Sequence, residues 1–182
     1  MRKRRLIASA AALPVVLAAG IWTGLGGAGQ GAESAETTGL TARLGAAQEV
    51  PKPTGVRTAA QGTFTAALVR TGAGGTLSWR LTFRGLTGKA TASHIHLGAR
   101  GRAGAVRVAL CGPCRSGARG SARVNARTVT ALLGGSTYVN VHTARNAAGE
   151  IRGQLAKTAK PPVIPPPPTT TGTTTEDPYP EG

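Results

Sequence analysis

Residues 75–83 alternate polar and apolar side chains without interruption. The apolar members are Leu77, Trp79, Leu81 and Phe83. A period of two is that of a β-strand with one buried and one solvated face. Similar short patterns, separated by glycine-rich turns, occupy residues 41–46, 62–69, 91–97, 105–110, 128–133, 137–142 and 150–155. Short strands in this arrangement predict an all-β fold, an antiparallel Greek-key β-sandwich with disordered termini.

The two ends of the chain differ from this pattern. Residues 1–28 start with a basic cluster, continue with an apolar stretch and end in small residues, which predicts a secretory signal peptide. An uncleaved N-terminal membrane anchor is the alternative, because the apolar stretch is nearly long enough to cross a bilayer. Residues 29–39 are expected to be a linker, and residues 157–182 a disordered tail rich in proline and threonine. The protein is therefore expected to be secreted or held at the cell envelope, with no membrane span after signal cleavage.

The region between these ends, residues 40–156, is strongly basic. It has sixteen lysines and arginines against Glu49 and Glu150, a net charge of +14. One stretch of it holds arginines and no acid, namely Arg100, Arg102, Arg107, Arg115, Arg119, Arg123 and Arg127. This patch predicts an anionic partner such as a cell-wall polymer or another acidic surface, with a merely solvated surface as the alternative. Few aromatic residues and no reading motif argue against specific nucleic-acid binding, and no oligomeric state is predicted.

The last four of these arginines recur every four residues. On a helix they would form one stripe of like charges, which destabilises a helix. The glycines and serines between them weaken a helix further. Residues 115–127 are therefore expected to form a basic loop that enters a strand.

Two cysteines, Cys111 and Cys114, enclose Gly112 and Pro113 in the spacing of a thioredoxin thiol pair. Thioredoxin chemistry needs the first thiol at a helix N-terminus, and no helical pattern follows here. We expect a short disulfide that closes a turn, with a redox role as the less favoured alternative. Such a small loop removes little entropy from the unfolded chain, so its stabilisation is expected to be modest.

The three histidines lie on two predicted strands. His94 and His96 are two apart, so their Cα atoms are about 6.6 Å apart and their rings share one side. His142 has the same parity as Tyr138 and Asn140 on the other strand. Convergence of the three imidazoles would predict a copper or zinc site. In the alternative, the imidazoles hydrogen-bond to buried backbone or carboxylate groups and hold two sheets together, so no cofactor is certain.

Glu49 and Glu150 are the carboxylates available to this basic domain. Buried carboxylates need partners, so each is expected to be paired if it is buried. Glu150 shares a strand face with Arg152 and is expected to orient a histidine ring by accepting its N–H. With Tyr138 and Asn140, these residues form the predicted polar support of the histidines. No arrangement for nucleophilic catalysis is found, which argues against a hydrolase and, less firmly, against any enzyme.

Four segments, residues 44–51, 92–98, 138–143 and 149–155, resemble in order the hallmarks of the CHRD (chordin-type) domain. The resemblance covers almost all of residues 40–155. It implies a secreted β-sandwich of immunoglobulin-like or superoxide-dismutase-like character. In animal chordin, a growth-factor antagonist, such domains accompany cysteine-rich modules. This chain carries none of these modules, so growth-factor binding is not carried over.

The strand with His94 and His96 is also similar to the copper-binding strand of copper/zinc superoxide dismutases, with His142 in the place of a later ligand. Those enzymes need a bridging histidine, further zinc ligands and an aspartate, which this domain lacks. Full dismutase function is therefore not expected. Two functions stay open: an exported, non-catalytic binding or structural module with a basic surface, and a copper- or zinc-binding protein with a three-histidine site. The separation of the three imidazoles distinguishes them.

Overall fold

The computed structural model describes residues 35–56 and 59–165. The expected signal peptide and the distal part of the proline-rich tail lie outside these residues. Within them, the strands are β1 (Thr37–Gly45), β2 (Gln61–Thr71), β3 (Gly74–Arg84), β4 (Ala90–Leu97), β5 (Val106–Cys111), β6 (Ala118–Val124), β7 (Thr137–Thr143), β8 (Ile151–Gln154) and β9 (Ala156–Thr158). Two short helices complete the fold, η1 (Ala46–Gln48) and α1 (Ala126–Leu133).

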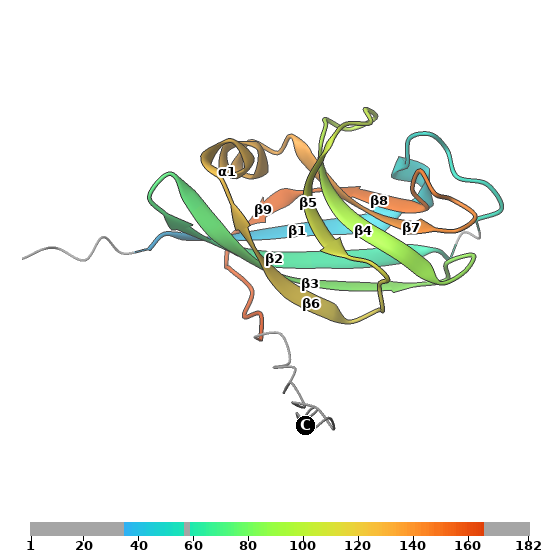
Figure 1. Cartoon of the computed structure of the whole chain (residues 1–182), viewed down its shortest axis with the longest axis horizontal. Coiled ribbons are helices and arrows are strands. Elements are labelled where there is room, and N and C mark those ends of the chain that lie inside the picture. Colours follow the sequence, from blue (N-terminus) through green and yellow to red (C-terminus); the bar gives the residue numbers. More distant parts are fainter. Residues whose placement is uncertain (1–34, 57–58, 166–182) are drawn as a thin grey trace, which may run out of the picture. The chain divides into compact units, whose positions relative to one another are not determined.

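All strand pairs are antiparallel, and the hydrogen-bonded order is β5-β4-β7-β8-β1-β2-β3-β6, with β9 added beside β1. The strands form two facing layers, β5-β4-β7-β8 and β1-β2-β3-β6 (Figure 1). The connections β3–β4, β5–β6 and β6–β7 each cross from one layer to the other. The edge strands β5 and β6 also contact each other, so the sheet is nearly closed. The predicted antiparallel β-sandwich is confirmed.

The core lies between the layers and follows the alternation of the strands. In β3, Leu77, Trp79 and Leu81 are buried while the intervening residues are not. Phe64 of β2 stacks on Trp79, with ring centroids 6.4 Å apart. Phe83, expected on the same buried face, is only partly buried and packs against the edge of the core.

One predicted strand is wrong: residues 128–133 belong to helix α1. The side chain of Asn125 caps its first turn by accepting a hydrogen bond from the Thr128 N–H at 2.9 Å. Val129 and Leu132, three residues apart, face the core from one side of the helix. The β-branched residues of this segment are compatible with a strand. The N-cap at Asn125 and the burial of Val129 and Leu132, three residues apart, are instead typical of a helix.

The basic stretch before α1 contains an edge strand. Strand β6 pairs with β3 along its length, from Ala118 opposite Leu81 to Val124 opposite Gly75. The expectation of a non-helical basic segment entering a strand therefore holds for residues 115–124, whereas Arg127 lies in α1. Strands β1 and β9 likewise extend into segments expected to be linker and tail.

Cys111 and Cys114 form the expected disulfide. It closes the turn after β5, and the next element along the chain is strand β6 and not a helix. The turn is tied to both layers, because Cys114 N donates to Ala90 O (3.1 Å) and Gly117 N donates to Leu81 O (2.8 Å). The disulfide turn thus bridges β3 and β4 at one end of the sandwich.

Candidate metal site

The polar residues of β4, β7 and β8 share the face of their layer that points away from the core. Since side chains alternate along a strand, burial of Ile95, Val139 and Ile151 in the core turns their neighbours to the opposite face. The residues on that face are His94, His96, Tyr138, Asn140, His142, Arg152 and Gln154. The predicted sharing of faces is confirmed. The cluster does not lie between the two sheets, where the alternative role of holding the sheets together would place it.

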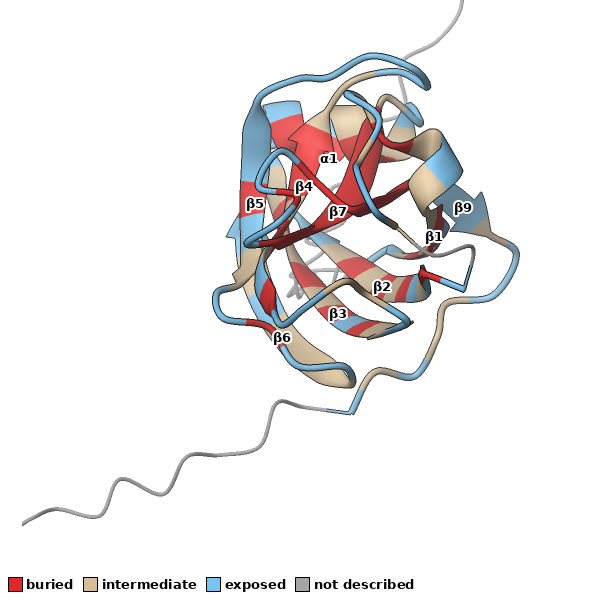
Figure 2. Cartoon of the chain, turned by 90° about the vertical axis from the view of Figure 1, so that its right-hand side faces the viewer, coloured by how far each residue is buried: buried red, intermediate tan, exposed pale blue. Residues whose placement is uncertain are grey.

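A loop between β4 and β5, residues 98–105, covers this outer face. Gly104 N donates a hydrogen bond to the Tyr138 hydroxyl (3.2 Å), and Ala99 O accepts one from Arg152 Nη2 (2.9 Å). As a result every residue of β7 is buried, on the core side by the other layer and on the outer side by this cover (Figure 2). The polar cluster is therefore covered on most of its outer side, and His94 is partly exposed.

The three histidines converge at one end of the outer face. The Nδ1 atom of His94 lies 3.1 Å from Nε2 of His142. One nitrogen from each of the three rings lies within 4.8 Å of the others. The ring centroids are 5.0 Å apart for His94 and His142, 5.7 Å for His94 and His96, and 6.2 Å for His96 and His142. The convergence that spacing alone leaves open is thus present.

Backbone carbonyls orient two of the imidazoles. Nδ1 of His96 lies 2.8 Å from Gly104 O, and Nδ1 of His142 lies 2.9 Å from Ala147 O. A carbonyl oxygen only accepts, so each Nδ1 donates its proton and each neutral ring keeps its lone pair on Nε2. In His142 this lone pair accepts a hydrogen bond from Nδ1 of His94 (3.1 Å). Nε2 of His96 is buried and has no hydrogen-bond partner among the described residues. Such carbonyl contacts are the usual way in which proteins orient metal-binding histidines.

Burial and neighbouring charges keep the rings of His94 and His142 uncharged. Burial lowers the pKa of His94 below its usual 6.5, and the nearby His142 and His96 lower it further. Burial also lowers the pKa of His142, and this outweighs the hydrogen bond to Ala147, which raises it. Only a neutral imidazole has a lone pair to offer a metal. Both rings are therefore in their ligating form at neutral pH.

The donor set fits copper or zinc. Zinc–nitrogen bonds are about 2.0–2.1 Å, so two nitrogens on a tetrahedral ion are about 3.3 Å apart. The separation between His94 and His142 is 3.1 Å. The ligand atom of His96 lies within 4.8 Å of theirs, so its side chain would have to move closer to reach the same ion. Three imidazoles without a carboxylate suit copper or zinc, whereas magnesium and calcium prefer oxygen ligands. His94 is the partly exposed member, which leaves one side of the site open to solvent.

A stack of side chains supports His96. The ring of Tyr138 stacks on it, with centroids 5.0 Å apart and planes 9° apart. The guanidinium carbon of Arg152 lies 3.3 Å from the centroid of the same tyrosine ring. Arg152 is 1% exposed, so this cation–π contact is shielded from water. His96 is consequently held at Nδ1 by Gly104 and on one ring face by Tyr138.

Comparison with known families identifies the domain that carries this site. The CHRD domain family matches residues 40–155. This chain belongs to the CHRD domain family. No match was found among curated proteins or among solved structures. The likeness of the His94–His96 strand to superoxide dismutases accordingly stays a prediction, whereas the CHRD resemblance is confirmed.

Glu49 supports the CHRD domain's polar cluster in a way that sequence reasoning did not foresee. It is 1% exposed and one carboxylate oxygen accepts from Val50 N (2.9 Å), while the other has no partner among the described residues. Burial raises its pKa to about 7, although the Val50 N–H and the charge of Arg152 both lower it. The carboxylate approaches Gly149 so closely that a Cβ at this position would collide with Glu49 Oε2. The expectation that a buried Glu49 is paired therefore holds for one of its two carboxylate oxygens.

Glu150 has a structural role apart from the histidines. Its carboxylate accepts hydrogen bonds from Thr87 N and Thr87 Oγ1, both 2.6 Å, from Thr143 Oγ1 at 2.6 Å and from Asn146 Nδ2 at 3.1 Å. Burial raises its pKa, but these hydrogen bonds outweigh that effect and leave the pKa below 4.5. The expectation that Glu150 orients a histidine is wrong: it joins the β3–β4 loop to the β7–β8 turn. Its partners carry no motif that would have revealed them.

The seven arginines of the predicted patch are dispersed over the CHRD domain. Arg100 and Arg102 belong to the loop that covers the polar cluster, where Arg100 Nη1 donates to Gln48 Oε1 (3.1 Å). The others lie on β5 (Arg107), the disulfide turn (Arg115), β6 (Arg119 and Arg123) and α1 (Arg127). The seven arginines thus come from several different elements and loops.

Within residues 35–56 and 59–165, no helix is both long and apolar enough to cross a bilayer.

Proposed function

We propose that this CHRD domain is a non-catalytic metal-binding module of an exported protein, which holds one copper or zinc ion through His94, His96 and His142. The observation that carries the proposal is the convergence of three imidazoles, two of which have their Nδ1 protons bound by backbone carbonyls and so carry their lone pair on Nε2. The export signal predicted at residues 1–28 and the typically extracellular character of CHRD domains support the location.

Metal stoichiometry tests this function. Protein without a histidine tag should, after treatment with a chelator, bind one equivalent of Cu(II) or Zn(II) that survives gel filtration. Substitution His142→Ala should lower the affinity at least about 100-fold, since a tridentate site loses one ligand and the imidazole partner of His94. Inductively coupled plasma mass spectrometry and competition with a chromophoric chelator give both quantities.

Tyr138→Phe is the matched control for this experiment. It keeps the ring that stacks on His96 and all three imidazoles, so it should retain one equivalent of metal. If the parent protein binds no metal while its thermal unfolding is cooperative, the site is structural and the proposal is wrong. Equal metal binding by the parent and by His142→Ala would also overturn it.

The outer face of the other layer favours a second function, the binding of an acidic polymer. In register, Arg80 of β3 lies directly opposite Arg119 of β6, with Thr65 of β2 on the other side of Arg80. Like charges directly opposite each other in a strand pair are destabilising. No acidic side chain among the described residues offsets the repulsion between Arg80 and Arg119. Glu49 and Glu150 are buried, and Glu36 pairs with Arg70. A carboxylate or phosphate bridging the two guanidinium groups would relieve it.

Retention on immobilised polygalacturonate tests the second function. It should fall steeply as salt is raised, because exposed charges are screened within about 10 Å at 0.1 M ionic strength. The double variant Arg80→Gln/Arg119→Gln should bind more weakly and yet be more stable by about 0.3–1 kcal/mol, since the repulsion is removed. Arg145→Gln, which removes an exposed charge elsewhere, is the control. Retention that is the same in both variants would contradict the assignment to this face.

A further inference from the structure

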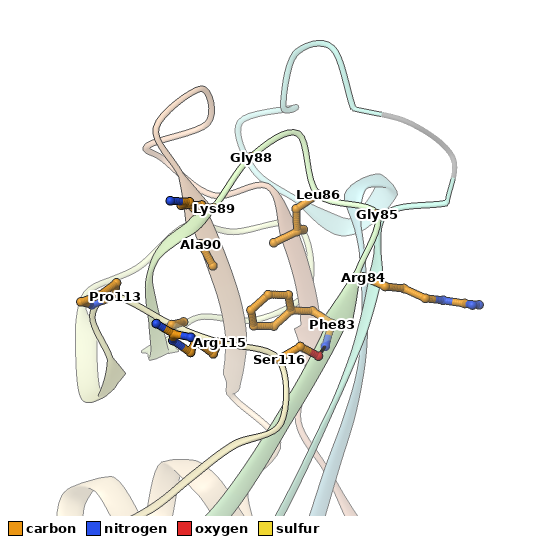
Figure 3. A pocket seen from close by; sticks show the side chains of 11 residues that line it. Phe83, Arg84, Gly85, Leu86, Gly88, Lys89, Ala90, Pro113, Arg115 and Ser116 are labelled. Carbon is orange, nitrogen blue, oxygen red and sulfur yellow. Dashed lines mark hydrogen bonds between the residues drawn. The ribbon is translucent and has the colours of Figure 1, made fainter.

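A hollow of about 750 Å³ opens beside the disulfide turn, away from the histidines. One wall is the end of β3 with the loop leading to β4, and the other wall is the disulfide turn (Figure 3). Phe83 and Leu86 point into the space between the two walls, toward Ala90, whereas Arg84 points away from it (Figure 3). Pro113 borders the hollow on the side of the disulfide turn.

Both walls are fixed by covalent and hydrogen bonds. The disulfide closes the turn, and Ser116 Oγ accepts a hydrogen bond from Phe83 N at 2.8 Å. Cys114 N donates to Ala90 O, so the same turn is also bound to the start of β4. The hollow is therefore pre-formed, and a ligand would bind without having to order the walls.

The lining combines an apolar interior with cations on both sides. Lys89 lies on the β3–β4 loop and Arg115 on the disulfide turn, and both are exposed. None of the described residues that line the hollow is acidic. A second hollow of about 610 Å³, bordered by Trp79 and Leu110, shares Pro113 and Arg115 with the first. Arg115 thus borders both hollows, and Lys89 borders the first one.

We infer that the hollow lined by Phe83, Leu86, Lys89 and Arg115 binds an amphipathic carboxylate, an alkyl or aryl body with one anionic head. The apolar body would bury Phe83 and Leu86, which contributes through the hydrophobic effect. The carboxylate would take charge-assisted hydrogen bonds from Lys89 and Arg115. A volume of several hundred Å³ with few polar groups is typical of small-molecule sites. This site shares no residue with the proposed metal site, and the inference does not depend on metal binding.

Titration of metal-free protein with octanoate, followed by ¹H–¹⁵N correlation spectra, tests the inference. Saturable shifts should appear at the amides of Leu86, Ala90 and Ser116. Octanoate should bind about five- to tenfold more tightly than 1-octanol, because two exposed cations each add a modest attraction. The preference should shrink at about 0.5 M NaCl, where screening is strong.

Two variants assign the binding to this hollow. Lys89→Gln, at an exposed position, should remove most of the preference for octanoate over 1-octanol while leaving the weaker binding of 1-octanol unchanged. Leu86→Ser should weaken both ligands, and Lys157→Gln on β9 should change neither. Shifts that spread over the surface without saturation would overturn the inference, as would equal affinities for octanoate and 1-octanol in the parent protein. Loss of metal binding in the experiment on His142→Ala has no bearing on either outcome.

Discussion

Substitution Arg152→Ala is expected to lower the free energy of unfolding by about 3–5 kcal/mol. Arg152 is 1% exposed and lies 3.3 Å above the ring of Tyr138, while its Nη2 donates to Ala99 O. Its removal leaves a cavity beneath the covering loop and deprives the buried Glu49 of a nearby positive charge. Guanidinium chloride unfolding at constant pH measures the change.

Two further variants separate volume from charge at this position. Arg152→Met keeps most of the buried volume and should recover about 2 kcal/mol of the loss, since an apolar residue of similar size often replaces a buried cation well. Arg123→Ala, at an exposed position of β6, should change stability by less than about 0.5 kcal/mol. A cost below about 1 kcal/mol for Arg152→Ala would show that the stack on His96 does not depend on this side chain.

Glu49→Gln should become the more stable protein as the pH rises. The pKa of Glu49 is about 7 in the folded chain and near its usual 4.5 in the unfolded chain. Between these values the folded chain holds the proton and the unfolded chain does not, so the wild type loses stability as pH rises through this window. The loss is complete above about pH 7 and amounts to about 3 kcal/mol. Glutamine does not titrate, so Glu49→Gln should not show this loss of stability.

Denaturant unfolding of both proteins at about pH 5 and about pH 8 measures the difference. The histidines act in the opposite direction: because the pKa values of His94 and His142 are lowered by folding, their contribution to stability is lost as pH falls below the usual 6.5. Both proteins share that effect, so it cancels in the comparison. Parallel stability profiles for wild type and Glu49→Gln would mean that Glu49 is charged in the folded protein at neutral pH.

The strands could be predicted where one face is buried and the other is wet. β3 is the clearest case, because Leu77, Trp79 and Leu81 alternate with polar residues that stay outside. α1 could not be recognised by alternation, since eight residues with several β-branched side chains suit either structure. Asn125 as an N-cap was the signal that could have identified it.

The candidate site was only partly predictable. Strand alternation alone predicts that His94 and His96 share one face of their strand, and that Tyr138 and His142 share one face of theirs. Which face points to the core was not predictable, because β7 is buried on both faces and its outer cover is the irregular loop 98–105. Glu150 shows the same limit: its partner Thr87 comes from a distant loop, and nothing in the local sequence indicates that pairing.

The coordination shell of the metal-loaded protein tests the central claim most directly. X-ray absorption spectra of the copper- or zinc-loaded protein should show three imidazole nitrogens at about 2.0–2.1 Å from the ion. His96→Ala, if it retains any metal, should show one imidazole fewer. A shell with one imidazole or none in the parent protein would contradict a site built from His94, His96 and His142.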